Sequence, residues 1–208
     1  MAHPFLALGD SYTIGEGVPE TERWPVALAT RLRTQGIALD PPRIVARTGW
    51  TTDELLAAMD TSRFDPPYDL VTLLIGVNDQ YRGRTLDEYR EPFVTSLQRA
   101  IALAGRRAGH VLVVSIPDWG VTPFARGDAR NPQRIAAEID AFNAAAQALV
   151  QAHGARHADI TALSRAASCR DLLTADGLHP SGAQYARWLE VIAPAAQSIL
   201  QASSDPVI

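Results

Sequence analysis

GDSYTIGEG, residues 9–17, is the stretch that decides the fold of this chain. It follows the short apolar run of residues 4–8, which predicts a buried β-strand that the chain leaves by a sharp turn. Ser11 stands at that exit, where a side chain can face a cleft instead of the core. A serine in this position supports chemistry only where other parts of the chain bring a general base and hydrogen-bond donors to it.

Beyond this stretch, short apolar runs alternate with longer runs of helical periodicity. Strands are predicted at residues 4–8, 43–47, 69–75, 110–116 and 155–160, and helices at 22–35, 52–60, 86–107, 132–152 and after Ser181. The alternation is typical of βαβ units. The predicted fold class is therefore α/β: a three-layer α/β/α sandwich with a five-stranded parallel sheet in a flavodoxin-like arrangement. A single domain over residues 1–208 is expected, with a frayed tail at about 203–208.

Several connections leave the carboxyl ends of the predicted strands, where open α/β sheets bind their ligands. They are the GDS turn, the turn that holds Gly49 and Trp50, the segment GVND at 76–79, and residues 117–130. A connection as long as 117–130 is uncommon in a compact domain and is usually functional. We therefore expect a ligand site where these segments meet.

The composition is that of a soluble globular protein, with 47% hydrophobic and 20% charged residues among 208. A chain of this length buries roughly 70% of the surface that it exposes when unfolded, so its core needs no metal or disulfide. The net charge of −4, without a concentrated basic run, argues against a nucleic-acid partner. No apolar stretch reaches about 18 residues, so no membrane span is expected.

Cysteine and histidine usage gives no sign of a metal or redox centre. Cys169 is the single cysteine, which excludes a disulfide within the chain and a cysteine-rich metal site. His153 and His157 stand four residues apart, but Gly154 lies between them and no third ligand is evident, so both are interpreted as surface residues. No cofactor and no metal are expected. Because no basic leader precedes the first predicted strand, a cytoplasmic location is expected, and the oligomeric state is left open.

Acyl transfer through a serine needs a base, a partner that orients the base, and donors for the developing oxyanion. Ser11 is the candidate nucleophile and His179 the candidate base. Asp176 precedes His179 by three residues in DGLH, a spacing that lets its carboxylate reach one imidazole nitrogen on an irregular segment. The Asn78 side-chain amide, the Gly49 N–H and the Ser11 N–H are the candidate oxyanion donors.

Together these motifs resemble the GDSL esterases and lipases, also called SGNH hydrolases. The resemblance is carried by GDS(Y) near the N-terminus, a glycine after the second strand, GxND after the third and DxxH near the C-terminus, and it spans residues 9–179. It implies the SGNH hydrolase fold, with Ser11 as nucleophile and with Asp176 and His179 completing a catalytic triad. It also implies that Ser11, Gly49 and Asn78 form the oxyanion hole.

The same resemblance implies a serine-dependent hydrolase that cleaves carboxylic esters through an acyl-enzyme on Ser11. Its partner would be a small-molecule ester: a small to medium acyl ester, a thioester or an acetylated carbohydrate. The family's usual leucine after GDS is Tyr12 here, a difference that affects the shape of the pocket and not the chemistry.

Four aromatic residues are candidate pocket residues because they lie on or beside the predicted cleft loops, although packing in the core is an alternative: Tyr12, Trp50, Trp119 and Phe124. Asp10 and Asp79 are interpreted as structural carboxylates that bind loop N–H groups. The alternative function is a flavodoxin-like phosphate- or cofactor-binding protein without hydrolase activity. The segment SYTIGEG would suit that function, but it would need neither GxND nor DxxH.

Overall fold

Parallel strands form the sheet that the sequence predicts, in a computed structural model that describes residues 2–166 and 172–202. Within these residues the strands are β1 (Phe5–Gly9), β2 (Arg43–Ala46), β3 (Leu70–Leu74), β4 (Val111–Val114) and β5 (Arg156–Ala158). All pair in parallel, in the order β2-β1-β3-β4-β5. This is the flavodoxin-like order, and the five-stranded prediction is confirmed. Cys169 and the predicted tail at 203–208 lie outside the described residues.

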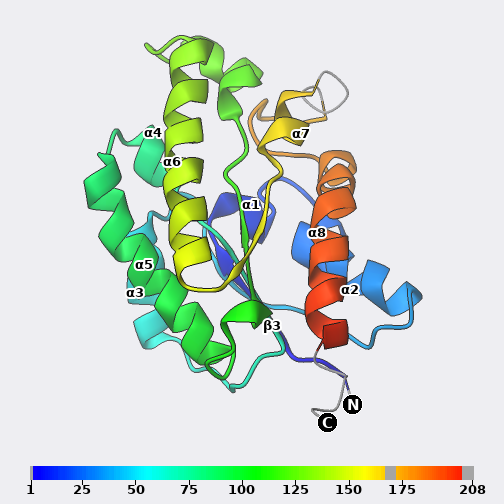
Figure 1. Cartoon of the computed structure of the whole chain (residues 1–208). Coiled ribbons are helices and arrows are strands. Elements are labelled where there is room, and N and C mark those ends of the chain that lie inside the picture. The colour runs from blue at the N-terminus through cyan, green and yellow to red at the C-terminus, as the bar shows by residue number, and fades with distance from the viewer. Residues whose placement is uncertain (1, 167–171, 203–208) are drawn as a thin grey trace.

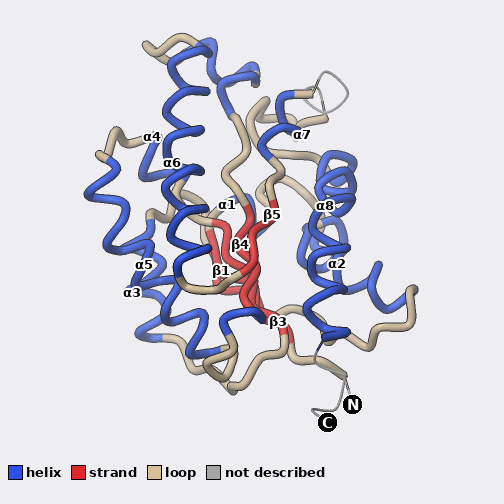
Figure 2. Tube along the Cα trace, viewed as in Figure 1, coloured by secondary structure: helices blue, strands red, loops and turns tan. Residues whose placement is uncertain are grey.

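Helices cover both faces of the sheet, as a three-layer sandwich requires (Figures 1 and 2). The long helices are α2 (Trp24–Thr34), α3 (Thr52–Thr61), α5 (Leu86–Leu103), α6 (Pro132–Ala152) and α8 (Gly182–Ala202), and the short ones are α1 (Ser11–Ile14), α4 (Val77–Tyr81) and α7 (Thr161–Arg165). Figure 2 shows α3, α5 and α6 on one side of the strands, with α2 and α8 on the other. No helix of the described residues is long and apolar enough to span a membrane.

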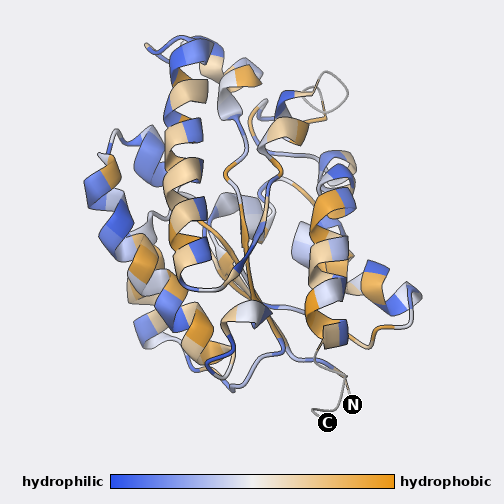
Figure 3. Cartoon of the chain, in the orientation of Figure 1, coloured by the Kyte–Doolittle hydropathy of each residue, from blue (hydrophilic) through white to orange (hydrophobic). Residues whose placement is uncertain are grey.

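The position of each strand in the sheet determines how much of it is buried in the core. Every residue of β1, β3 and β4 is buried, whereas the edge strands β2 and β5 are partly exposed. A strand covered on both faces must be apolar throughout, which is why residues 69–75 and 110–116 are nearly continuous hydrophobic runs. In Figure 3 the central strands are largely orange, whereas the helices carry both orange and blue.

The capping boxes predicted for two helices are present. Thr51 and Glu54 start α3, and Thr85 and Glu88 start α5. α5 ends at Leu103, earlier than the predicted residue 107, because Gly105 and Arg106 take left-handed backbone angles with φ of 70° and 64°.

Two predicted turns are instead one-turn helices. The exits of β1 and β3 continue directly into α1 and α4, and α7 lies in a region for which no helix was predicted. The connection 117–130 contains two 3₁₀ turns, Trp119–Val121 and Pro123–Gly127. Single turns are too short to show a helical period, so the sequence pattern gives no sign of them.

The strand order indicates where on the sheet a ligand would bind. From β1 the chain crosses first to β2 on one side and later to β3 on the other, so the order reverses between β1 and β3. Open α/β sheets bind ligands at this switch point, beyond the carboxyl ends of the strands. The segments that leave β1 and β3 there are α1, which begins with Ser11, and α4, which contains Asn78.

Gly9 lies where this switch point is most tightly packed. A Cβ atom built on Gly9 would collide with the Thr13 side chain and with the backbone oxygen of Leu74 on the neighbouring strand. We predict that Gly9→Ala lowers the free energy of unfolding by about 1–3 kcal/mol, because a backbone contact cannot move aside. Gly109→Ala is the matched control, since nothing lies within 4 Å of a Cβ there. Urea denaturation of both variants measures the difference, and equal effects would contradict the packing argument.

Candidate active site

A small cavity opens at the carboxyl edge of the sheet. Its volume is about 130 Å³. It is lined by residues from five separate parts of the chain: Ser11, Tyr12, Thr48, Gly49, Val77, Asn78, Tyr81, Trp119, Phe124, Leu178 and His179. The predicted meeting of the GDS, Gly49, GVND and 117–130 segments is therefore confirmed, and the DGLH segment joins them.

Ser11 is the first residue of α1 and is 5% exposed. The preceding Asp10 caps this turn: its carboxylate accepts the Tyr12 N–H at 3.0 Å. The Asp10 carbonyl accepts from Thr13 and Ile14 at 3.1 and 2.9 Å. Asp10 thus occupies the other N–H groups at the start of α1, and the N–H of Ser11 is left beside its own hydroxyl.

His179 is buried, and Asp176 fixes its ring. The Nδ1 atom of His179 lies 2.6 Å from Oδ2 of Asp176. The other carboxylate oxygen of Asp176 accepts the Leu178 and His179 N–H groups at 2.8 and 3.0 Å, and the Thr174 hydroxyl at 2.7 Å. Burial alone would raise the pKa of Asp176, but these hydrogen bonds, led by that from His179, hold the pKa well below its usual range. The carboxylate is therefore ionised and keeps Nε2 as the free ring nitrogen of His179.

Asn78 and Gly49 lie side by side because their segments are bonded to each other. The Asn78 Nδ2 group donates to the Trp50 carbonyl at 2.9 Å, which uses one of its two N–H bonds. Gly49 has a φ of +87°, a conformation that favours glycine. Its carbonyl accepts from the Arg82 guanidinium at 2.7 Å. Asn78 keeps one N–H beyond this bond, and both Asn78 and Gly49 line the cavity that Ser11 lines.

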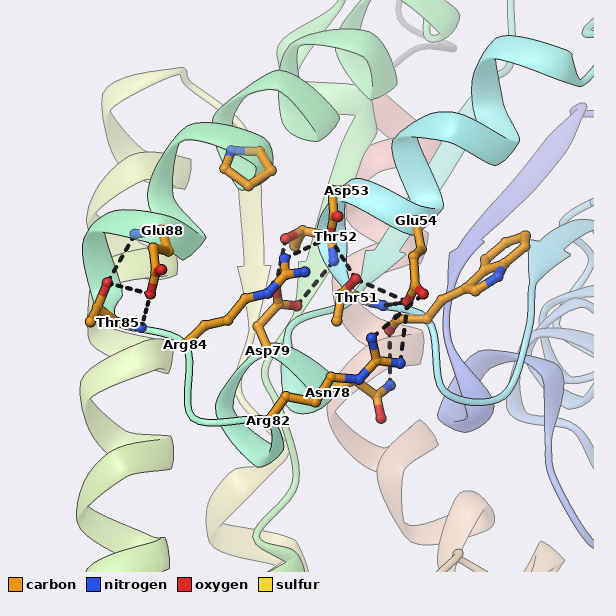
Figure 4. A network of polar contacts seen from close by, with 12 residues as sticks. Thr51, Thr52, Asp53, Glu54, Asn78, Asp79, Arg82, Arg84, Thr85 and Glu88 are labelled. Carbon is orange, nitrogen blue, oxygen red and sulfur yellow. Dashed lines mark hydrogen bonds and ion pairs between the residues drawn. The ribbon is translucent and has the colours of Figure 1, made fainter.

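Asp79 also connects α4 to the segment that follows β2, through Thr52. It is fully buried, and its carboxylate accepts the Thr52 N–H at 3.0 Å and the Thr52 hydroxyl at 2.8 Å. Arg84 completes its shell with a 3.0 Å ion pair (Figure 4). The structural role predicted for Asp10 and Asp79 is confirmed, since both carboxylates bind backbone N–H groups.

The predicted pocket aromatics divide into two groups. Tyr12, Trp119 and Phe124 line the cavity, and the Tyr12 ring meets the His179 ring edge-on with centroids 5.8 Å apart. Trp50, in contrast, lies outside the lining: its ring packs against the core, and it serves the site through its carbonyl oxygen.

Sequence reasoning missed several lining residues, namely Thr48, Val77, Tyr81 and Leu178. Val77 and Tyr81 are four residues apart on α4, so they share one helical face. Recognising the segment 77–81 as a helical turn would have paired them.

No metal-binding cluster is found in the part of the chain that the structure describes, where no three His, Cys, Asp or Glu side chains could hold an ion. His153 and His157 were expected on the surface, but both are only partly exposed. Burial lowers the pKa of His157.

Comparison with known proteins found a matching family model and similar solved structures. The model of the GDSL-like Lipase/Acylhydrolase family matches residues 7–187. The solved structure of TesA is similar with a TM-score of 0.73 at 23% identity, covering 95% of this chain and 99% of that chain. The psychrotrophic esterase EstA from Pseudoalteromonas sp., solved with monoethylphosphonate as inhibitor, gives a TM-score of 0.72 at 16% identity, covering 96% and 99%. Phospholipase A1 from Streptomyces albidoflavus NA297 gives 0.68 at 17%, covering 95% and 99%.

A search among curated proteins gave no match. The fold and the match to residues 7–187 define a carboxylic ester hydrolase. The chain belongs to the GDSL-like lipase/acylhydrolase family, because that match covers most of its length. The predicted resemblance is thereby confirmed, and the alternative of a phosphate-binding protein without hydrolase activity is set aside.

The buried Asp10 generates a prediction about stability and pH. Burial, with the nearby Asp79 adding to it, raises the pKa of Asp10 from 3.8 to about 8. Between these values the unfolded chain has released this proton while the folded chain keeps it, so the contribution of Asp10 to stability falls as pH rises. Asp10→Asn keeps the cap acceptor and removes the titration. Relative to the native chain, we expect this variant to gain about 1 kcal/mol or more of stability between about pH 5 and pH 9.

Urea unfolding at several pH values measures this difference. Asp87→Asn is the control, because the Asp87 side chain is 90% exposed. A flat difference for Asp10→Asn across the range would show that Asp10 is ionised in the folded protein.

Proposed function

We propose that the protein hydrolyses esters of small acyl groups through an acyl-enzyme on Ser11, with His179 as general base and Asp176 as its orienting partner. One observation carries the proposal: the nucleophile, the base and the oxyanion donors Gly49 and Asn78 all line a single cavity. Asp176 stands behind the base, bonded to Nδ1.

In the first half-reaction, Oγ of Ser11 attacks the ester carbonyl carbon and gives its proton to Nε2 of His179. The carbonyl oxygen becomes an oxyanion, held by the N–H groups of Ser11 and Gly49 and by the Asn78 amide. The carbon–oxygen bond to the alcohol then breaks, and the leaving alcohol takes the proton from His179. The acyl group stays on Ser11 as an ester.

In the second half-reaction, water replaces the alcohol. It gives a proton to His179 and attacks the acyl carbon, and the same donors hold the second oxyanion. The bond to Oγ breaks, Ser11 recovers its proton from His179, and the carboxylic acid leaves. Asp176 stays ionised throughout and stabilises the imidazolium that forms in each half.

The size of the cavity favours short acyl groups. A protein cavity of about 150 Å³ holds one benzene molecule, and this one has about 130 Å³. Its lining includes apolar and aromatic side chains, among them Val77, Trp119 and Leu178. A chain of about four carbons, or a single ring, would fill this space. A long fatty chain would have to leave it past Tyr81 and Phe124, which are 44% and 41% exposed.

Replacing the nucleophile tests the mechanism. Ser11→Ala should lower kcat for p-nitrophenyl acetate by about 10⁴-fold or more and abolish any burst of p-nitrophenol, because no acyl-enzyme can form. Ser62→Ala, at the end of α3, is the matched control and should keep normal turnover. Retention of most activity by Ser11→Ala would exclude this mechanism.

Asn78→Ala tests the oxyanion hole. If the free N–H of Asn78 binds the oxyanion, its loss should cost about 10²–10³-fold in kcat with little change in KM. Asn131→Ala removes a similar amide, one that caps α6, and should leave kcat unchanged. Steady-state kinetics on p-nitrophenyl butyrate give both values, and a loss under about tenfold would remove Asn78 from this role.

A further inference from the structure

Trp119, the largest side chain in the cavity wall, is held by a side chain from another segment. The Trp119 Nε1–H donates to Oε1 of Gln80 at 2.8 Å, and both residues are almost fully buried, at 2% and 1% exposure. The other end of Gln80 is also fixed, because its Nε2 donates to Glu138 on α6 at 2.8 Å. The amide of Gln80 therefore cannot turn away from Trp119 without breaking a second bond.

Arg130 holds the flat face of the same ring. Its guanidinium lies 5.2 Å from the centroid of the Trp119 ring and 5.6 Å from that of Tyr81, within the range of cation–π contacts. Arg130 in turn is bound to Glu138 at 3.2 Å and to the Gln80 carbonyl at 3.3 Å. Trp119 is thus fixed at its edge by Gln80 and at its face by Arg130.

Trp119 lines two neighbouring spaces. One is the cavity that Ser11 lines. A second hollow of about 10 Å³, too small for more than one water molecule, shares the walls formed by Tyr12, Trp119 and Leu178. The connection after Trp119 borders a further groove of about 650 Å³, which extends to Pro132. Trp119 lines both the cavity and the small hollow, but not the groove, so a displaced ring would extend the cavity first into the hollow.

We propose that Gln80 is a positioning residue that sets the acyl length this enzyme accepts, by holding Trp119 as the end wall of the cavity. The inference rests on the proposed function in one respect: the acyl group must occupy the cavity beside Ser11. Gln80 itself lies behind Trp119 and is absent from the cavity lining, so it acts only through that ring.

The hydrogen bond explains why Gln80, and not packing alone, fixes the wall. Leucine at position 80 would fill a similar volume but would leave the buried Trp119 N–H without its acceptor. A buried donor without a partner is costly, so the ring would turn to find another acceptor or water. The cavity would then lose its fixed end while the groups around Ser11 stay in place.

The test is a panel of p-nitrophenyl acetate, butyrate, hexanoate and octanoate with three variants: Gln80→Leu, Trp119→Phe and the double variant. Each single variant should raise the ratio of kcat/KM for octanoate to that for butyrate by about tenfold, the size of effect that one methylene has in an apolar pocket. Because both variants remove the same bond, the double variant should raise the ratio far less than the product of the single effects.

Arg134→Gln is the matched control. It removes an exposed partner of Glu138, at 2.9 Å, without touching the Gln80–Trp119 bond, and it should leave the ratio unchanged. A purely structural role of Gln80 would lower kcat/KM for all four esters alike. That result, or independent effects in the double variant, would overturn the proposal.

Two further outcomes would also be decisive. If Gln80→Leu does not fold, Trp119→Phe decides alone, since it keeps an aromatic ring but has no N–H, and an unchanged ratio would overturn the proposal. If the native protein cleaves none of the esters, or Ser11→Ala cleaves them equally well, the proposed function fails instead. A native protein that is active and depends on Ser11, with ratios that Gln80→Leu and Trp119→Phe leave unchanged, would refute only the role of Gln80.

Discussion

The buried carboxylate of Asp79 is the interaction on which the site depends. A charge with no exposure to water is costly unless donors surround it, and Asp79 takes its donors from Thr52 and Arg84. Burial is the main reason why the pKa of Asp79 is raised, and the bonds to Thr52 and Arg84 oppose it. Thr52 lies shortly after Gly49, and Asn78 directly precedes Asp79. The bonds to one carboxylate therefore also connect the segments that carry Gly49 and Asn78, the two proposed oxyanion donors.

The side chains of the short helix α4 bond to several different parts of the site. Successive residues of a helix point about 100° apart, so Asn78, Asp79 and Gln80 reach different neighbours. Asn78 bonds the Trp50 carbonyl, Asp79 bonds Thr52, and Gln80 bonds Trp119. Beyond the turn, Arg82 binds the Gly49 carbonyl, and it also pairs with Glu54 (Figure 4). One short segment thus connects the Gly49 side of the cavity to its aromatic wall.

How much of the structure the sequence could predict depends on how far apart in the chain the interacting residues lie. The strand at 69–75 and the capping boxes at Thr51 and Thr85 are local patterns, and the structure has them where they were expected. The meeting of Ser11, Gly49 and Asn78 followed from strand topology, because parallel strands end at one edge. His179 follows no predicted strand, and only its motif and the family resemblance assigned it to the site.

What could not be predicted depends on packing between distant residues. Nothing in the local sequence links Gln80 to Trp119, which lie 39 positions apart. The one-turn helices α1 and α4 are too short to show a period, so Tyr81 was not recognised as a wall residue. Trp50 shows the converse: its place beside a cleft loop suggested pocket lining, whereas the structure uses only its carbonyl.

The hydrogen bonds around Asp176 have a consequence for how the site can vary. Every bond that orients the base comes from residues 174–179, and the same segment is closed by a 2.8 Å bond from the Thr174 N–H to the His179 carbonyl. The Asp176–His179 pair is therefore held by bonds within one short segment, and the Phe124 N–H joins that segment to the 117–130 connection through the Gly177 carbonyl at 3.1 Å. A change at Tyr12, whose ring meets that of His179 edge-on, would therefore act on the aromatic wall and on this pair at once.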